Sequence, residues 1–288
     1  MVETAILWAL CAAVFFGLAL VLAQFGLRSI SPTHGALLTL PSMTALLWAL
    51  AIVFLDWRGA ELVGVGSFIA AGVLFPGIVT VLTHEANRRM GPTVAGALGN
   101  LAPLFAVPAA AILLGELPRP LQAFGILTIV VGIVLLSFTR RSSLATSWPF
   151  WVVVLPIGAA AIRGLSQSVI KLGLMHWPSP FGAVLLTYTA SCLVVTAIVL
   201  LRGDWPSGFR REGVLWFGGV GLANGAAMVS LYQALDRGPV ILVAPLVATY
   251  PLVTLALSAV IFRAPRRDPI LVAGVLLTVI GVAMLIGL

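Results

Sequence analysis

The sequence predicts an all-α integral membrane protein whose ten transmembrane helices form two inverted five-helix repeats. Three observations lead to this prediction: the composition, a succession of long apolar runs, and an internal repeat covering nearly the whole chain. The 288 residues are 61% hydrophobic and only 9% charged, whereas a soluble domain carries about 25% charged residues. Such a chain cannot cover a water-facing surface, so a lipid bilayer is its expected environment.

Ten apolar runs, bounded by charged residues, proline or glycine, are the candidate helices. A membrane-spanning helix needs roughly 20 apolar residues, so ten of them fit into the chain with short loops. The runs lack the alternation of a transmembrane barrel, and several begin with a proline, which costs no backbone donor in a first helical turn. The expected spans are 4–27, 33–55, 62–85, 92–114, 120–138, 149–175, 180–201, 211–234, 239–262 and 269–287.

The two halves of the chain repeat each other. Gly91-Pro92 recurs 147 residues later as Gly238-Pro239, and Asp56-Trp57 recurs 148 residues later as Asp204-Trp205. Because each half has an odd number of helices, the second half enters the membrane from the opposite side, as in many secondary transporters with a midplane site between the repeats. The first repeat is expected in residues 1–141 and the second in residues 142–288.

The net charge of +7 comes mainly from loop arginines, and no basic cluster exceeds two residues, so nucleic-acid binding is not expected. The loops after the odd-numbered helices hold eleven arginines, and the opposite side holds three, Arg58, Arg119 and Arg237. The positive-inside rule therefore places the arginine-rich loops in the cytoplasm and both termini outside.

A stripe of polar side chains crosses the sixth run. Arg163, Gln167 and Lys171 follow one another at four-residue steps, so they share one face of a helix. Polar groups inside a bilayer are functional candidates by default, and arginine can donate two parallel hydrogen bonds to a carboxylate. All three are candidate substrate-binding residues. The alternative is structural: Arg163 would bind helix-end carbonyls, and Lys171 would extend toward the interface.

Prolines inside the fourth and ninth runs leave backbone carbonyls without helical donors, a gap tolerated only beside neighbouring helices or a watery cavity. Asn100, Thr249 and Tyr250 stand beside these prolines. They are candidate cavity-lining residues, or they bond to a neighbouring helix and only support packing. Thr80, Tyr188 and Asn224 complete the candidate substrate-binding set, and the candidate hinge or gate residues are Pro76, Gly99, Pro103, Pro245 and Pro251.

The nine acidic residues all fall in loops or at helix ends. No carboxylate is therefore expected at the membrane centre to carry a coupling proton or to bind a cationic drug. Glu85 is the nearest candidate, and an interfacial pair with Arg88 or Arg89 is the alternative. The three histidines lack the spacing of metal ligands, so neither a metal site nor a cofactor is expected.

The order and duplication of several motifs resemble the ten-helix EamA branch of the drug/metabolite transporter superfamily, and within it the YddG-type exporters. The motifs are Trp8…Phe15-Phe16-Gly17, Gly91-Pro92…Ala102-Pro103 and Leu114-Gly115-Glu116…Gln122…Gly125…Gly132, which the second half echoes. The resemblance implies a transporter in the bacterial inner membrane. It also implies that both termini lie in the cytoplasm, against the charge count, so the orientation stays open.

We expect a secondary transporter that exports small amphipathic metabolites, above all amino acids, by alternating access around a midplane cavity. The expected partners are a small-molecule substrate and the lipid bilayer. Ten helices can enclose a complete cavity, which allows a monomer. The alternative substrate class is a nucleotide sugar or another anionic metabolite. Two other classes fit less well: a membrane-embedded enzyme lacks a nucleophile–base or metal motif, and a structural subunit would not require an inverted repeat.

Overall fold

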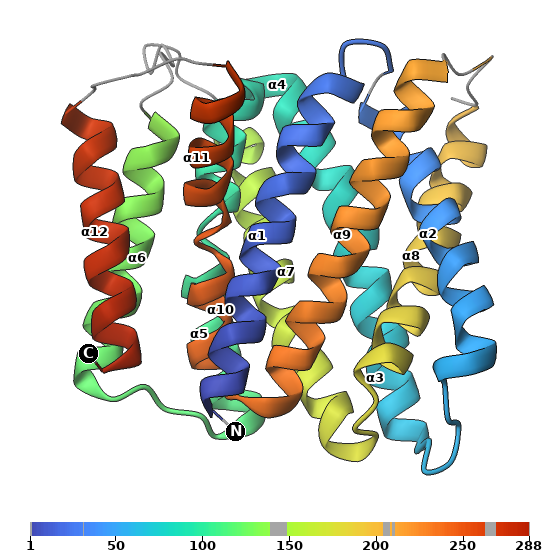
Figure 1. The fold of residues 1–288 in the computed structure, drawn as a ribbon, viewed down its shortest axis with the longest axis horizontal. Helices are drawn as coiled ribbons and strands as arrows, with labels where there is room; N and C mark the ends of the chain where they lie inside the picture. The colour runs from blue at the N-terminus through green and yellow to red at the C-terminus, as the bar shows by residue number, and fades with distance from the viewer. Residues whose placement is uncertain are drawn as a thin grey trace.

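The computed structural model describes residues 2–30, 32–138, 149–203, 208, 211–262 and 269–287, which form a bundle of helices (Figure 1). The first repeat contains α1 (Val2–Gly26), α2 (Pro32–Phe54), α3 (Leu62–Gly72), the π-helix η1 (Val73–Ile78), α4 (Val79–Gly99), α5 (Ala102–Leu114) and α6 (Pro120–Phe138). The second contains α7 (Phe150–His176), α8 (Pro180–Arg202), α9 (Arg211–Arg237), α10 (Val240–Val247), α11 (Tyr250–Phe262) and α12 (Pro269–Ile286).

These elements make ten passes through the bundle, and the predicted fold class is confirmed. Within the described ranges, nine helical spans are long and apolar enough to cross a membrane, and the shorter apolar segment Pro120–Leu136 of α6 makes the tenth pass. Large apolar side chains such as Ile52 and Leu201, each 87% exposed, cover the outside of the bundle. A lipid-facing surface has this character.

The third pass is longer than predicted, because its helix continues past residue 85 to the kink at Gly91 inside α4. Gly91 has φ 80° and ψ 154°, a conformation that glycine adopts without steric cost. The fourth and ninth passes are each divided in two: α4 gives way to α5 after Gly99, and α10 gives way to α11 after Val247. The runs 92–114 and 239–262, in which the prolines predicted kinks, are therefore each broken near their midpoints.

The contact between α6 and α12 demonstrates the inverted repeat. A Cβ atom built on Gly125 would lie 2.8 Å from the carbonyl oxygen of Gly281, and one built on Gly132 would lie 2.8 Å from that of Gly274. Gly125 corresponds to Gly274 in the repeat, and Gly132 corresponds to Gly281. If each residue is replaced by its counterpart in the other repeat, the Gly125–Gly281 contact therefore becomes the Gly132–Gly274 contact. The predicted boundary at residues 141 and 142 lies outside the described residues and stays a prediction.

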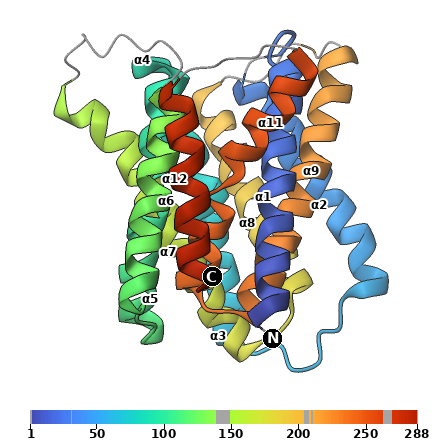
Figure 2. The same ribbon diagram turned by 60° about the vertical axis from the view of Figure 1, so that its left-hand side comes forward.

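Both termini lie toward the same end of the bundle, here called the terminus end (Figures 1 and 2). The α1 helix packs on α9 and α11, as its counterpart α7 packs on α3 and α5. Fully buried residues close the terminus end, among them Ala5, Ala234, Leu235 and Val240. The helix breaks near the centre of the bundle leave less complete packing there.

Candidate functional site

A cavity of about 330 Å³ lies between the two repeats. Its lining comes from α1, α2, η1, α4, α5, α7, α8, α9, α10 and α11. Leu20, Ala36 and Thr39 line it on the side away from the terminus end, while Leu231 and Ala244 line the side nearer to it. The cavity therefore extends from the middle of the bundle away from the closed terminus end.

The break between α4 and α5 supplies one wall of this cavity. Pro103 has no amide hydrogen, so the carbonyl group of Gly99, four residues earlier, loses its helical donor. Arg163 replaces that donor, because its Nη1 donates to the Gly99 oxygen at 3.2 Å. The guanidinium carbon of Arg163 also lies 5.4 Å from the centre of the Phe75 ring, within the range of a cation–π contact. Arg163 is thus held at the cavity wall.

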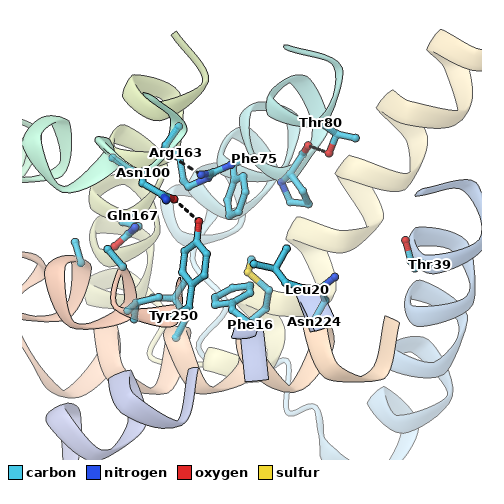
Figure 3. Close-up of a pocket in the computed structure, with 18 of the residues that line it drawn as sticks. Phe16, Leu20, Thr39, Phe75, Thr80, Asn100, Arg163, Gln167, Asn224 and Tyr250 are labelled. Carbon is cyan, nitrogen blue, oxygen red and sulfur yellow. Dashed lines mark hydrogen bonds between the residues drawn. The ribbon is translucent and has the colours of Figure 1, made fainter. Parts of the chain in front are cut away.

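Asn100 and Tyr250 connect the two broken helices at one side of the cavity. The Tyr250 hydroxyl donates to Asn100 Oδ1 at 2.5 Å, and the rings of Tyr250 and Phe16 are 6.2 Å apart between centroids. Figure 3 shows Arg163, Asn100, Gln167 and Tyr250 together at one side of the cavity. Both repeats therefore contribute to one polar cluster around Arg163.

At a third break, in η1, side chains of α8 and α4 donate hydrogen bonds to backbone carbonyls. Pro76 deprives the Gly72 carbonyl of its helical donor, and Ser191 Oγ of α8 donates to that oxygen at 2.7 Å instead. Thr80 Oγ1 donates to the Pro76 oxygen at 2.6 Å. The backbone is thus satisfied here, while Phe75, Pro76 and Thr80 face the cavity.

Most of the candidate substrate-binding residues line the cavity. They are Thr80, Asn100, Arg163, Gln167, Tyr188, Asn224 and Tyr250, and the hinge candidates Pro76, Gly99 and Pro103 line it too. Gln167 is 8% exposed, and its Oε1 atom is buried without a hydrogen-bond partner in the described part of the chain. The binding roles of these residues stay predictions.

Lys171 and Thr249 do not line the cavity, contrary to expectation. Lys171 Nζ donates to the Leu235 carbonyl at 2.6 Å and to the Asp236 carbonyl at 3.4 Å, so it caps the carboxyl end of α9, where cations are stabilising. Thr249 Oγ1 donates to the Leu246 carbonyl at 2.7 Å. Both side chains instead bind backbone carbonyls near helix ends. Arg163 does the same at Gly99, the last residue of α4, so the structural alternative stated for Arg163 is met as well.

Pro245 and Pro251 lie beside the cavity but outside its lining. Residues that sequence reasoning did not select complete the wall, notably Phe16, Leu20, Thr39, Phe75 and Met228. Four of these five are apolar residues within apolar helices, so no periodic pattern distinguishes their cavity face from their lipid face. Phe16 and Leu20 carried a signal, as the repeat counterparts of Arg163 and Gln167, 147 residues earlier.

The acidic side chains near the site have structural partners. Glu85 pairs with both Arg88, at 2.8 Å, and Arg89, as the interfacial alternative predicted. Glu116 follows α5 and accepts a hydrogen bond from the Ile241 amide of α10 at 3.2 Å. Burial raises the pKa of Glu116, although the amides of Ile241 and Val240 oppose the shift. Glu116 therefore caps α10 at the terminus end.

The electrostatic character of the cavity follows from this arrangement. Among the residues that the structure describes, Arg163 is the one charged side chain in the lining, and no carboxylate accompanies it. Aromatic and aliphatic side chains surround it, while Asn224 and Thr39 supply polar groups at the other side of the view in Figure 3. An apolar pocket with a few placed polar groups is typical of small-molecule sites. This one suits a ligand with an anionic end and an apolar body.

Comparisons with known proteins agree with the fold and the repeat. No curated protein is significantly similar to the chain. One solved structure, described only as "Crystal structure of protein", has 22% sequence identity and a TM-score of 0.76, and the match covers 98% of each chain. That likeness shows a shared fold alone. The sequence profile of the EamA-like transporter family matches residues 3–138 and again residues 150–287. Because the profile covers one full repeat in each half, this multi-pass membrane protein belongs to the EamA-like transporter family.

Proposed function

We propose that the protein is a secondary transporter that exports small amphipathic metabolites, most of all amino acids, across the bacterial inner membrane. The single observation that carries this proposal is the unaccompanied guanidinium of Arg163 in an otherwise neutral, apolar-walled cavity. Arg163 uses one nitrogen to hold Gly99, and guanidinium has five N–H donors. Enough donors remain to bind a substrate carboxylate.

The size and charge of the cavity favour an amino acid over the alternative substrates. A volume of about 330 Å³ lies at the small end of ligand pockets, and a nucleotide sugar would bring two phosphate charges to one arginine. A cationic drug would meet Arg163 without any lining carboxylate. These features support a compact ligand with one carboxylate.

Transport follows by alternating access in this proposal. The buried layer at the terminus end closes one exit, and the cavity extends toward the other. Exchange of the two states would require the broken helices to move around Pro76, Gly99, Pro103, Pro245 and Pro251. One chain encloses the whole cavity, so a monomer suffices.

The test is transport by the purified chain in proteoliposomes. Each of the twenty amino acids is supplied with radiolabel, and flux is compared for wild type, Arg163→Ala, Arg163→Lys and the loop control Arg119→Ala. We expect flux of at least one amino acid, a loss of about tenfold or more in Arg163→Ala (~1.4 kcal/mol per factor of ten), partial retention in Arg163→Lys, and wild-type flux in Arg119→Ala. Absence of flux for all twenty amino acids would refute the proposed substrate class.

A further inference from the structure

The two breaks that line the cavity are copies of each other. At the first, amides of Asn100, Leu101 and Leu104 donate to the carbonyls of residues 96, 98 and 101. At the second, amides of Ala248, Thr249 and Leu252 donate to the carbonyls of residues 244, 246 and 249. Each donor and each acceptor is displaced by 148 residues, so the local backbone is the same in both repeats.

The same displacement relates the two prolines and the carbonyls that they leave without helical donors. Pro103 corresponds to Pro251, and Gly99 corresponds to Val247. Because Pro251 has no amide hydrogen, it cannot donate to the Val247 carbonyl. Gly99 and Val247 both line the cavity. The inverted repeat therefore gives two residues of the cavity lining a carbonyl group without its helical donor.

The two carbonyls differ in the residue that the repeat assigns to them. The Gly99 oxygen accepts a hydrogen bond from Arg163 of α7, whose counterpart on α1 is Phe16. The packing of these helices obeys the repeat: a Cβ atom on Gly164 would lie 2.6 Å from the Ala106 amide of α5, and one on Gly17 would lie 2.7 Å from Val253 of α11. Phe16 thus occupies the place of Arg163, and a phenyl ring has no hydrogen to donate.

We propose that the Val247 carbonyl, with the neighbouring rings of Phe16 and Tyr250, is the binding site for the substrate's ammonium group, while Arg163 binds its carboxylate. The inference rests on the proposed function and sharpens it, since the substrate is then a zwitterion. An ammonium group donates hydrogen bonds to carbonyl oxygens, and it is attracted by aromatic faces. Phe16, Tyr250 and Val247 all line the cavity.

In an α-amino acid the two charged groups are attached to the same carbon, so the proposal requires their binding sites to be neighbours. The breaks meet directly, because the Tyr250 hydroxyl at the second donates to Asn100 at the first, at 2.5 Å. A carboxylate beside Arg163 therefore has the second break as its neighbour. A simple carboxylic acid would leave the Val247 carbonyl unpaired, and a simple amine would be repelled by Arg163.

The first experiment compares matched ligands on the full-length protein in lipid nanodiscs. Two sets are used: leucine, 4-methylpentanoate and 3-methylbutylamine, and phenylalanine, 3-phenylpropanoate and 2-phenylethylamine. We expect at least one amino acid to bind at least tenfold more tightly than its deaminated acid, because an unpaired buried acceptor is costly, with its amine weakest. Equal or tighter binding of both acids would overturn the ammonium site and leave a carboxylate transporter standing. If neither amino acid and neither acid binds, the amino acid that shows flux is compared with its own acid and amine, and absence of flux for all twenty overturns the ammonium site together with the proposed function.

The second experiment supplies the missing donor. Pro251→Ala restores an amide that can donate to Val247, and Phe16→Gln places a donor on α1 where Arg163 stands on α7. Either variant is expected to reduce the preference for amino acid over acid at least tenfold, mainly by weakening amino-acid binding. Pro108→Ala is the control, because Pro108 is a helix proline outside the cavity lining, and it should keep the wild-type preference.

The two variants protect the test against misfolding. Phe16→Gln leaves the break between α10 and α11 intact. If Pro251→Ala does not give a monodisperse, helical protein, the ligand preference of Phe16→Gln alone tests the ammonium site. Wild-type preference in the folded variants, with the same Kd ratio as Pro108→Ala, would overturn the proposed ammonium site.

Discussion

The hydroxyl group of Tyr250 donates a hydrogen bond to Asn100 Oδ1 at 2.5 Å, and so connects the break in one repeat to the break in the other. The two residues are 150 positions apart, yet this contact brings Arg163 and the second broken helix into one site. Alternating access requires the repeats to move relative to each other. The contact is therefore a candidate for one that forms and breaks during transport.

Removing either partner should reveal this coupling. Tyr250→Phe and Asn100→Ala are each expected to destabilise the protein, and the double variant is expected to lose less than the sum. The difference should be about 1 kcal/mol, the usual net contribution of a hydrogen bond. Reversible unfolding in mixed micelles measures it. Tyr188→Phe combined with Asn100→Ala is the control pair and should be additive; additivity in the Tyr250 cycle would show that the contact contributes nothing.

Arg163 is expected to have two separable roles. Arg163→Ala removes both the substrate's partner and the donor to the Gly99 carbonyl, so it should lower stability by about 1–3 kcal/mol and reduce transport about tenfold or more. Adding Pro103→Ala restores a backbone amide near that carbonyl. The double variant should regain part of the stability but no transport. Recovery of transport along with stability would mean that Arg163 only supports the helix break.

Glu116 should make stability depend on pH. Because burial raises the pKa of Glu116 above its usual 4.5, the folded protein holds this proton more tightly than the unfolded chain does. The stability that protonation contributes is complete below about pH 4.5. It is lost as the pH rises through the folded-state pKa. Relative to Glu116→Gln, which cannot ionise, wild type should therefore lose stability as the pH rises above about 4.5 and through the folded-state pKa.

Thermal unfolding of the two proteins across this pH range checks the prediction. Their difference in Tm isolates the carboxyl group, because every other titrating group is common to both. The prediction would be contradicted if the difference in Tm between wild type and Glu116→Gln stayed constant, or if wild type gained stability relative to Glu116→Gln as the pH rises.

The glycine contact between α6 and α12 should tolerate no side chain. A Cβ atom on Gly132 would lie 2.7 Å from the Thr278 backbone nitrogen and 2.8 Å from the Gly274 oxygen, so the backbones must separate. Gly132→Ala is expected to cost about 1–3 kcal/mol, as overpacking does. Gly158→Ala in α7 is the control, because its Cβ atom would meet nothing within 4 Å. Equal stability of both variants would show that the two helices adjust freely.

The sequence by itself determined the class of protein, the ten passes and the inverted repeat. Each of these depends on local or additive properties: the hydrophobicity of a run of residues, the odd number of runs in a half, and motifs such as Gly91-Pro92 that recur at a nearly constant spacing. Prolines also indicated where helices could break, because a proline removes a backbone donor, but Pro108 and Pro245 stand inside helices that continue past them.

Only the tertiary structure decided which polar groups face the cavity. Arg163 and Lys171 lie on one stripe of one helix, yet Arg163 lines the cavity, whereas Lys171 binds carbonyls at the end of α9. Apolar lining residues such as Phe75 were not detectable either. In a membrane helix every face is apolar, so hydrophobic periodicity does not report orientation. The direction in which each side chain points is set by packing against helices far away in the sequence. It is therefore decided only when the two repeats pack together.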